Sequence, residues 1–201
     1  MLLEIYPEAP EPRKIRRAVE ALLAGEVIAY PTDTVYGLGC DLFNKKAIEK
    51  LCQMKGVPIT FPLAFVCSDL SDIATYAIVE NPQYRLLKRY TPGPYCFILQ
   101  ATREVPKLVL SKRKTVGIRV PNNAVALAIT RELGRPIISS SAQIQGEDPF
   151  IDAREIQDAF PQVALAIDAG AGGIIPTTVV DLTTGAPSVV RQGLGPVDEF
   201  L

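Results

Sequence analysis

The sequence predicts a single α/β domain built on a mixed, twisted and open β-sheet. Its 201 residues are 48% hydrophobic, which suits one packed core and argues against a disordered chain. Strand-like apolar runs alternate with helical segments through most of the chain, and further strand-like runs gather near its end. Because no repeat, low-complexity segment or linker interrupts this pattern, we expect one domain over residues 1–201.

The first predicted elements are a helix over 12–24 and a strand over 27–30. Apolar residues recur at helical spacing in the first segment, namely Ile15, Ala18, Val19, Leu22 and Leu23. Gly25 is suited to end this helix, because glycine readily adopts the left-handed conformation found after helices. Pro31 ends the strand, since it has no N–H for a sheet ladder.

The later elements follow from caps, turns and periodicity. Helices are predicted over 44–54, from Ser68 to about Tyr76, from Pro82 to about Tyr90, over 122–133, and from Asp152 to Phe160. The expected N-terminal caps of the first, second and fourth of these helices are Asn44, Ser68 and Asn123. Strands are predicted over 62–67, 95–100, 115–120, 136–139, 163–167, 178–182 and 188–191.

A polar segment follows the strand at 27–30. Its residues carry hydroxyl, carboxylate and aromatic groups and two glycines: Thr32, Asp33, Thr34, Tyr36, Gly37 and Gly39. Ligands of open α/β sheets bind in loops at strand ends, so the segment is a candidate binding loop. A polar turn between two strands explains the same residues equally well.

Composition excludes several kinds of site. With no histidine, the chain has no Ser-His-Asp triad, Cys-His dyad or histidine-ligated metal. The four cysteines are widely spaced, which favours buried free thiols in a reducing cytoplasm over zinc or disulfides. We therefore expect no metal site. We see no membrane-length apolar run and no signal peptide, and expect a cytoplasmic protein.

The net charge is −1, yet basic residues cluster in one region. Glu104 is the one acid there, among Arg103, Lys107, Lys112, Arg113, Lys114 and Arg119. Such a patch can bind RNA phosphates, with Lys107, Lys112, Arg113 and Lys114 as candidate contacts. A solvated loop is the other interpretation.

Several motifs occur in one order along the chain: PTDTVYGLG at 31–39, TPGPYCFIL at 91–99, KTVGIRVP at 114–121, PIISSSAQIQG at 136–146, PTTVVDLT at 176–183 and VVRQGLG at 189–195. This set resembles the YrdC-like family, which contains the threonylcarbamoyl-AMP synthases of tRNA modification and the YciO branch. The chain's length and ending are most similar to the YciO branch.

The resemblance implies a twisted open sheet, flanked by helices, with a concave basic cleft. It also implies a reaction in which threonine, bicarbonate and ATP give threonylcarbamoyl-AMP and pyrophosphate. ATP would arrive with Mg²⁺ as a substrate complex, and no tightly bound cofactor is expected.

The resemblance also assigns candidate site residues. Lys55, Ser139, Ser141, Gln143 and Arg191 match nucleotide-binding positions. The positions for threonine or a carboxylate are matched by Thr32, Thr34, Tyr36, Arg119 and either Thr177 or Thr178. From the residues alone, Lys55 is equally well a surface lysine, and Arg119 a strand arginine paired with an acid.

Three positions depart from the family pattern. Val57 replaces the arginine of K-x-R, Val66 the histidine of N-P-L-x-V-H, and Gln143 the asparagine of S-x-S-A-N. We therefore expect a YciO-type nucleotide- and RNA-binding protein with weak or altered synthase activity. The alternatives are a fully active synthase, and a non-catalytic module for double-stranded RNA, tRNA or rRNA. Whether the chain is an enzyme stays open, and we expect a monomer or weak dimer without membrane contact.

Overall fold

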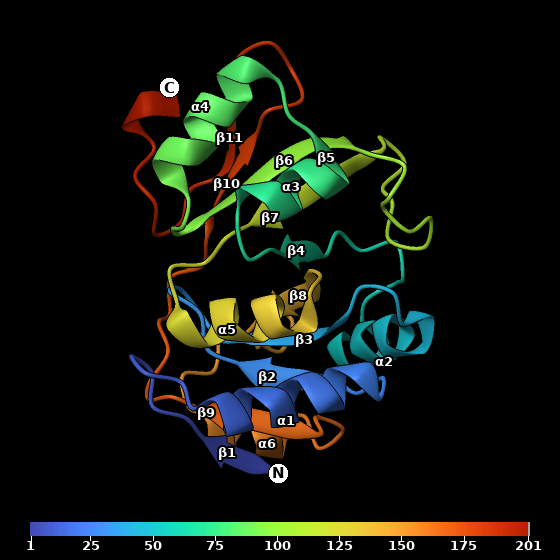
Figure 1. Ribbon diagram of the computed structural model, residues 1–201, viewed down its shortest axis with the longest axis vertical. Coiled ribbons are helices and arrows are strands. Elements are labelled where there is room, and N and C mark those ends of the chain that lie inside the picture. The colour runs from blue at the N-terminus through green and yellow to red at the C-terminus, as the bar shows by residue number, and fades with distance from the viewer. Residues whose placement is uncertain (201) are drawn as a thin grey trace.

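The computed structural model describes residues 1–200, which form a single α/β domain on one open, mixed β-sheet (Figure 1). The strands are β1 (Leu2–Glu4), β2 (Ile28–Tyr30), β3 (Gly37–Asp41), β4 (Ala64–Val66), β5 (Ala77–Ile78), β6 (Tyr95–Ala101), β7 (Thr115–Arg119), β8 (Ile137–Ser141), β9 (Leu165–Asp168), β10 (Thr178–Asp181) and β11 (Ser188–Arg191). Their order is β1-β9-β2-β3-β8-β4-β7-β6-β10-β11, and β5 pairs with β6. The β9 strand runs parallel to β1 and β2, whereas β8 runs antiparallel to β3 and β4. The predicted fold class is thus confirmed.

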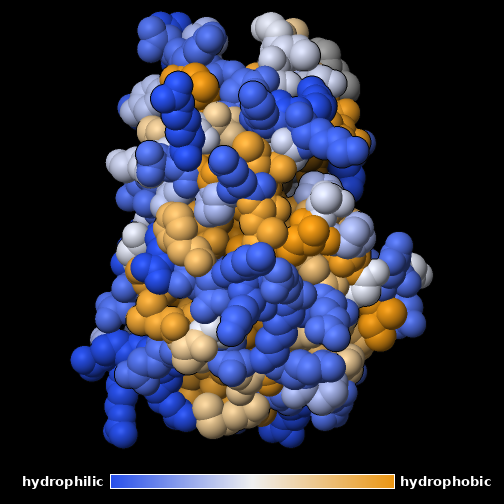
Figure 2. Space-filling view, turned by 90° about the vertical axis from the view of Figure 1, so that its right-hand side faces the viewer, coloured by the Kyte–Doolittle hydropathy of each residue, from blue (hydrophilic) through white to orange (hydrophobic). Residues whose placement is uncertain are grey.

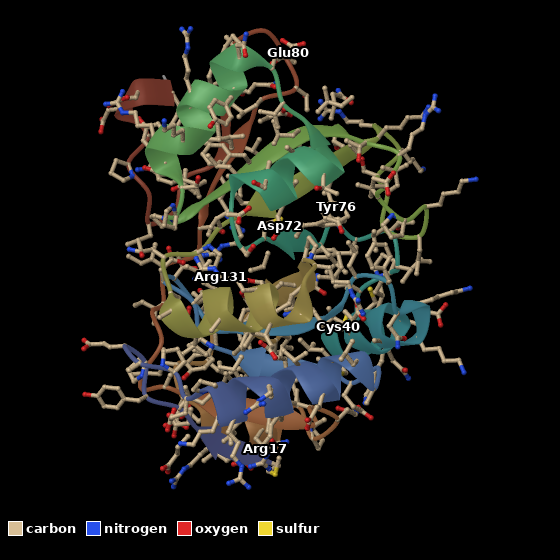
Figure 3. All side chains as sticks on the ribbon, viewed as in Figure 1. Arg17, Cys40, Asp72, Tyr76, Glu80 and Arg131 are labelled. Atoms are coloured by element: carbon tan, nitrogen blue, oxygen red, sulfur yellow. The ribbon has the colours of Figure 1, made fainter. Side chains whose placement is uncertain are left out.

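The helices are α1 (Pro12–Leu23), α2 (Lys45–Lys55), α3 (Leu70–Tyr76), α4 (Asn81–Tyr90), α5 (Ala124–Leu133) and α6 (Ala153–Ala159), followed by the short helix η1 (Asp198–Phe200). The Asn44 and Asn123 side chains cap α2 and α5 as predicted, by accepting from the N–H of Ala47 and Ala126. The predicted cap at Ser68 is wrong. Asp69 caps α3, and the Ser68 hydroxyl instead donates to Asp72, whose place on α3 is labelled in Figure 3.

The predicted loop glycines lie in a strand, which corrects the sequence analysis. Gly37 and Gly39 belong to β3, since the Tyr30 ring lies across them. A Cβ on Gly39 would stand 2.8 Å from that ring and 2.5 Å from the Ile137 side chain. Glycine is therefore needed here for close packing within a strand and not for a turn.

The predicted strand 136–139 is also longer than expected at its end, because β8 continues through Ser141. Besides β3, the short strands β1 and β5 were missed, and the predicted strand 62–67 is shorter, at Ala64–Val66. Strands this short have too few residues for an alternating pattern to stand out.

The two faces of the sheet have different coverings. One hydrophobic cluster joins Leu38, Cys40, Phe65, Phe97 and Ile138 to apolar residues of α2, α3, α4 and α6. On the other face, α1 and α5 pack on a smaller cluster that includes Ile28, Tyr30, Val66, Ile137 and Ile167.

Beyond α5, this second face continues over small residues. Ser139 pairs with Ala64, Ala64 with Gly117, and Gly117 with Ile98, so the four share one face. Ala64, Gly117 and Ile98 are each only half-buried. We call this part of the sheet the open face.

The side of the molecule that carries α2 has a band of apolar surface across its middle, with hydrophilic surface above and below it (Figure 2). The connection 56–63 between α2 and β4 runs on this side (Figure 1), and its Phe61 is 40% exposed. Among residues 1–200, no helix combines the length and the apolar character that crossing a membrane requires.

Candidate functional site

Arg119 is the most buried charged group of the candidate site. It ends β7 and is only 8% exposed. Its Nη2 donates to the Asp33 carboxylate, and its Nη1 donates to the Thr34 hydroxyl over 3.3 Å. Its Nε–H is also buried and has no acceptor among residues 1–200. The structure therefore pairs Arg119 with an acid and leaves one edge of its guanidinium unsatisfied.

The loop 31–36 carries the groups that hold Arg119. Besides contacting Arg119, Asp33 accepts from the N–H of Asn122 over 2.9 Å. The Thr32 hydroxyl donates to the Val35 carbonyl over 2.7 Å and accepts from the N–H of Thr34. The loop is thus braced internally. Asp33, which lies in the candidate binding loop but was given no ligand role by the resemblance, joins this loop to the end of β7.

Residues 169–177, which we call the strap, pack against this loop. Tyr36 is fully buried, and its hydroxyl donates to the Gly170 carbonyl over 2.8 Å. The N–H of Gly173 donates to the Thr34 carbonyl over 2.8 Å. Tyr36, a predicted threonine-binding residue, therefore supports the strap with its hydroxyl.

Ser139 lies on the strand beside this loop. Its hydroxyl accepts from the Tyr30 hydroxyl over 2.6 Å, and burial raises the pKa of Tyr30 to about 12. Tyr30 stays neutral and holds Ser139. Sequence reasoning placed Tyr30 only in the strand, because an aromatic residue at the end of an apolar run is indistinguishable from an ordinary core residue.

Lys55, Ser141 and Gln143 come together where β8 ends. The Lys55 ammonium donates to the Ser141 carbonyl over 2.8 Å and also to the Gln143 carbonyl. The Ser141 hydroxyl donates to the Gln143 side-chain carbonyl over 2.9 Å. Burial lowers the pKa of Lys55 to about 8.

Arg191 is joined to Thr177 at the end of the strap. Its Nε and Nη2 donate to the Thr177 carbonyl over 3.1 and 2.9 Å, and Nη2 also donates to the Thr177 hydroxyl. The Thr178 hydroxyl instead donates to the Gly195 carbonyl over 2.6 Å, and its side chain is fully buried. Of the two threonines left open by the sequence, Thr177 is the one beside Arg191.

The predicted RNA-binding residues lie apart from Arg119. Lys107, Lys112, Arg113 and Lys114 are exposed on the loop between β6 and β7. This loop enters β7 at Thr115, at the opposite end of the strand from Arg119. Arg113 alone is tied to the sheet, by donating to Asp181 over 3.4 Å and to Thr183 over 3.2 Å.

Two of the three positions that depart from the family pattern, Val57 and Val66, lie in apolar surroundings. Val57 packs partly buried against the main core, and Val66 is buried in the cluster beneath α5. All four cysteines are buried free thiols, as expected, and Cys40 lies in the interior near α2 (Figure 3). No group of three or more acidic or cysteine side chains is placed to hold a metal within residues 1–200.

Comparison with known proteins gives one consistent result. The family model of Sua5, YciO and YrdC proteins, described as "Telomere recombination", matches residues 20–193. The uncharacterized protein YciO of Escherichia coli K12 is 45% identical over 200 residues, covering 98% of this chain and 97% of YciO. A crystal structure of E. coli YciO superposes with a TM-score of 0.95, at 44% identity, over 100% of this chain and 99% of that one.

Proteins named threonylcarbamoyl-AMP synthase are among the relatives with lower identity. The threonylcarbamoyl-AMP synthase of Pyrococcus abyssi is 32% identical over 197 residues, covering 96% of this chain and 58% of the synthase. The P. abyssi Sua5 structure with L-threonine gives a TM-score of 0.92 at 30% identity, over 99% of this chain and 59% of that one. This chain therefore spans little more than half of that enzyme.

Proposed function

The chain belongs to the Sua5/YciO/YrdC family, and on that basis we propose that it binds a nucleotide and a small carboxylate over the open face of its sheet. The reaction to test is that of the related synthases, in which ATP, threonine and bicarbonate give threonylcarbamoyl-AMP and pyrophosphate. We propose weak or altered activity of this kind, in the cytoplasm, with Mg²⁺ delivered by ATP.

The unsatisfied edge of Arg119 is the observation that carries this proposal. A buried N–H without an acceptor is costly, and a ligand carboxylate would remove that cost with a charge-assisted bond. Asp33 and Thr34 hold the rest of the guanidinium, so this edge is already oriented before a ligand arrives. The P. abyssi Sua5 structure is a complex with L-threonine, a ligand that carries a carboxylate.

The departures at three positions support weak or altered activity. Val57 and Val66 cannot bind phosphate or donate a hydrogen bond from their side chains. The Gln143 amide already accepts from Ser141 and donates to the Glu147 carbonyl over 3.0 Å. The side chains that replace polar family residues thus contribute packing or internal bonds.

A two-part measurement tests the proposal. The purified chain is heated with ATP and Mg²⁺, with threonine, or with both, and the same samples are assayed with bicarbonate for pyrophosphate. Ligands that bind the native state raise the midpoint of thermal unfolding. Slow threonine-dependent pyrophosphate release is expected. No shift with any ligand would contradict the proposal, and release at the rate of a family synthase would favour the fully active alternative.

We propose RNA binding as a second function, because the loop between β6 and β7 presents basic side chains to solvent. Changing Lys112, Arg113 and Lys114 together to glutamate should abolish binding to structured RNA and leave the thermal shift with ATP unchanged. The matched control changes Arg13, Arg16 and Arg17, which are exposed on α1. Equal losses in both variants would mean that net charge alone matters, and normal binding by the loop variant would exclude this surface.

A further inference from the structure

We propose that the Lys55 ammonium group holds the candidate nucleotide-binding turn 141–143 in place by donating to backbone carbonyls of that turn. On this proposal Lys55 does not itself bind a phosphate group. This inference rests on the proposed nucleotide site. It differs from the phosphate role that the K-x-R resemblance implies for Lys55.

The contacts of Lys55 are the first step. Lys55 is the last residue of α2, and its ammonium group turns toward the end of β8. Two of its three N–H donors are taken by the carbonyls of Ser141 and Gln143. A phosphate at Lys55 would have to compete with both carbonyls.

The turn that receives Lys55 carries two candidate nucleotide-binding side chains. The N–H of Gln143 donates to the Ser141 carbonyl over 3.0 Å, and the Ser141 hydroxyl donates to the Gln143 side chain. The Gln143 amide reaches on to Glu147. Lys55 therefore closes a network that fixes where the Ser141 hydroxyl and the Gln143 amide lie.

The neighbourhood of Lys55 supports a positioning role. Val57 stands where the family pattern has an arginine, and it packs against the core. A second cation from this motif, which would pair with Lys55 around a triphosphate, is therefore missing. The residue of the motif that this chain retains is Lys55, and Lys55 bonds to the turn.

The affinities of adenosine and of ATP with Mg²⁺ separate the two roles. Each is measured by calorimetry for the wild-type chain and for Lys55→Met, with Lys46→Met as the matched control, since Lys46 is exposed on the same helix. If Lys55 positions the turn, Lys55→Met weakens both ligands by the same factor, on the order of tenfold. If Lys55 binds phosphate, only ATP binding weakens, and the inference is overturned.

A second variant decides the matter if Lys55→Met does not fold. Lys55→Gln keeps two N–H donors for the carbonyls and removes the charge. The ratio of ATP affinity to adenosine affinity should then stay at its wild-type value, and a fall in this ratio would overturn the inference. A wild-type chain that binds ATP without measurable adenosine binding would overturn it too. A wild-type chain that binds neither ligand would instead refute the proposed function.

Discussion

Arg119 and Asp33 are an ion pair with little access to water, since their side chains are 9% and 12% exposed. Removing one partner leaves the other charge buried and unpaired. We expect Arg119→Met to lower the free energy of unfolding by about 3–5 kcal/mol. A double variant that combines Arg119→Met with Asp33→Asn should recover part of that loss, because it no longer buries an unpaired carboxylate. Urea denaturation measures both. A double variant no more stable than the single one would show that the pair is not energetically coupled.

Arg119 should also decide carboxylate affinity. We expect Arg119→Met to weaken threonine binding by about 1.5–3 kcal/mol, because a charge-assisted bond is lost. Calorimetry at a temperature where the variant stays folded measures this. Arg131→Met is the control, since Arg131 is exposed on α5 (Figure 3). Unchanged threonine affinity in Arg119→Met would leave Arg119 with a structural role alone.

Lys55 gives a pH dependence with a definite sign. Burial lowers its pKa to about 8 in the folded chain, from an ordinary value of 10.5. Below about pH 8 both states hold the proton, so Lys55 contributes no pH dependence. Between these two values the unfolded chain binds more protons, and the free energy of unfolding should rise with pH.

The measurement for this effect is the difference in unfolding free energy between the wild type and Lys55→Met. It should increase from about pH 8 to about pH 10. Taking the difference removes the titration of tyrosines and cysteines that both proteins share. A difference that falls over this range would mean that the fold favours charged Lys55, so that its two carbonyl contacts outweigh burial.

At the scale of elements, the strap depends on one glycine. A Cβ on Gly173 would stand 2.3 Å from the Thr34 carbonyl oxygen, which is backbone and cannot rotate away. Gly173→Ala should therefore push the strap off the loop 31–36 and lower the free energy of unfolding by about 1–3 kcal/mol.

Gly185→Ala is the matched control, because a Cβ there meets no atom within 4 Å. It should change stability by less than about 0.5 kcal/mol. Chemical denaturation compares the two variants. Equal stability would show that the strap can move without cost, and that its contact with Thr34 does not hold the loop.

At the scale of the whole molecule, the sheet and its helices enclose every cysteine. Burial raises the pKa of Cys96 to about 11 and that of Cys67 well above its usual range. Because the thiolate is the reactive form, a thiol reagent at about pH 8 should modify none of the four in the native protein. All four should react after denaturation in guanidinium. Rapid modification of one cysteine in the native protein would contradict this prediction, because it would show that the core opens to the reagent.

Element positions followed well from local signals in the sequence. Asn44 and Asn123 mark the starts of α2 and α5, and the glycines that follow these helices mark their ends. The hydrogen bonds that make these caps join residues only a few positions apart in the sequence. The strands β3 and β8 were harder to bound, because their glycine and serine residues usually indicate loops. They are strands here because Tyr30 and neighbouring strands pack over them, and these contacts are distant in sequence.

The sequence by itself determined the fold class, the family and the candidate residues, because periodicity, caps and motifs depend on residues that are close together in the sequence. Only the tertiary structure decided how those residues are used. Asp33 reaches Arg119 across 86 positions, and Lys55 reaches Ser141 across the same separation. Burial and competing acceptors exist only once the chain is packed. They determine that Arg119 keeps one edge unsatisfied, whereas Lys55 has two of its three donors engaged.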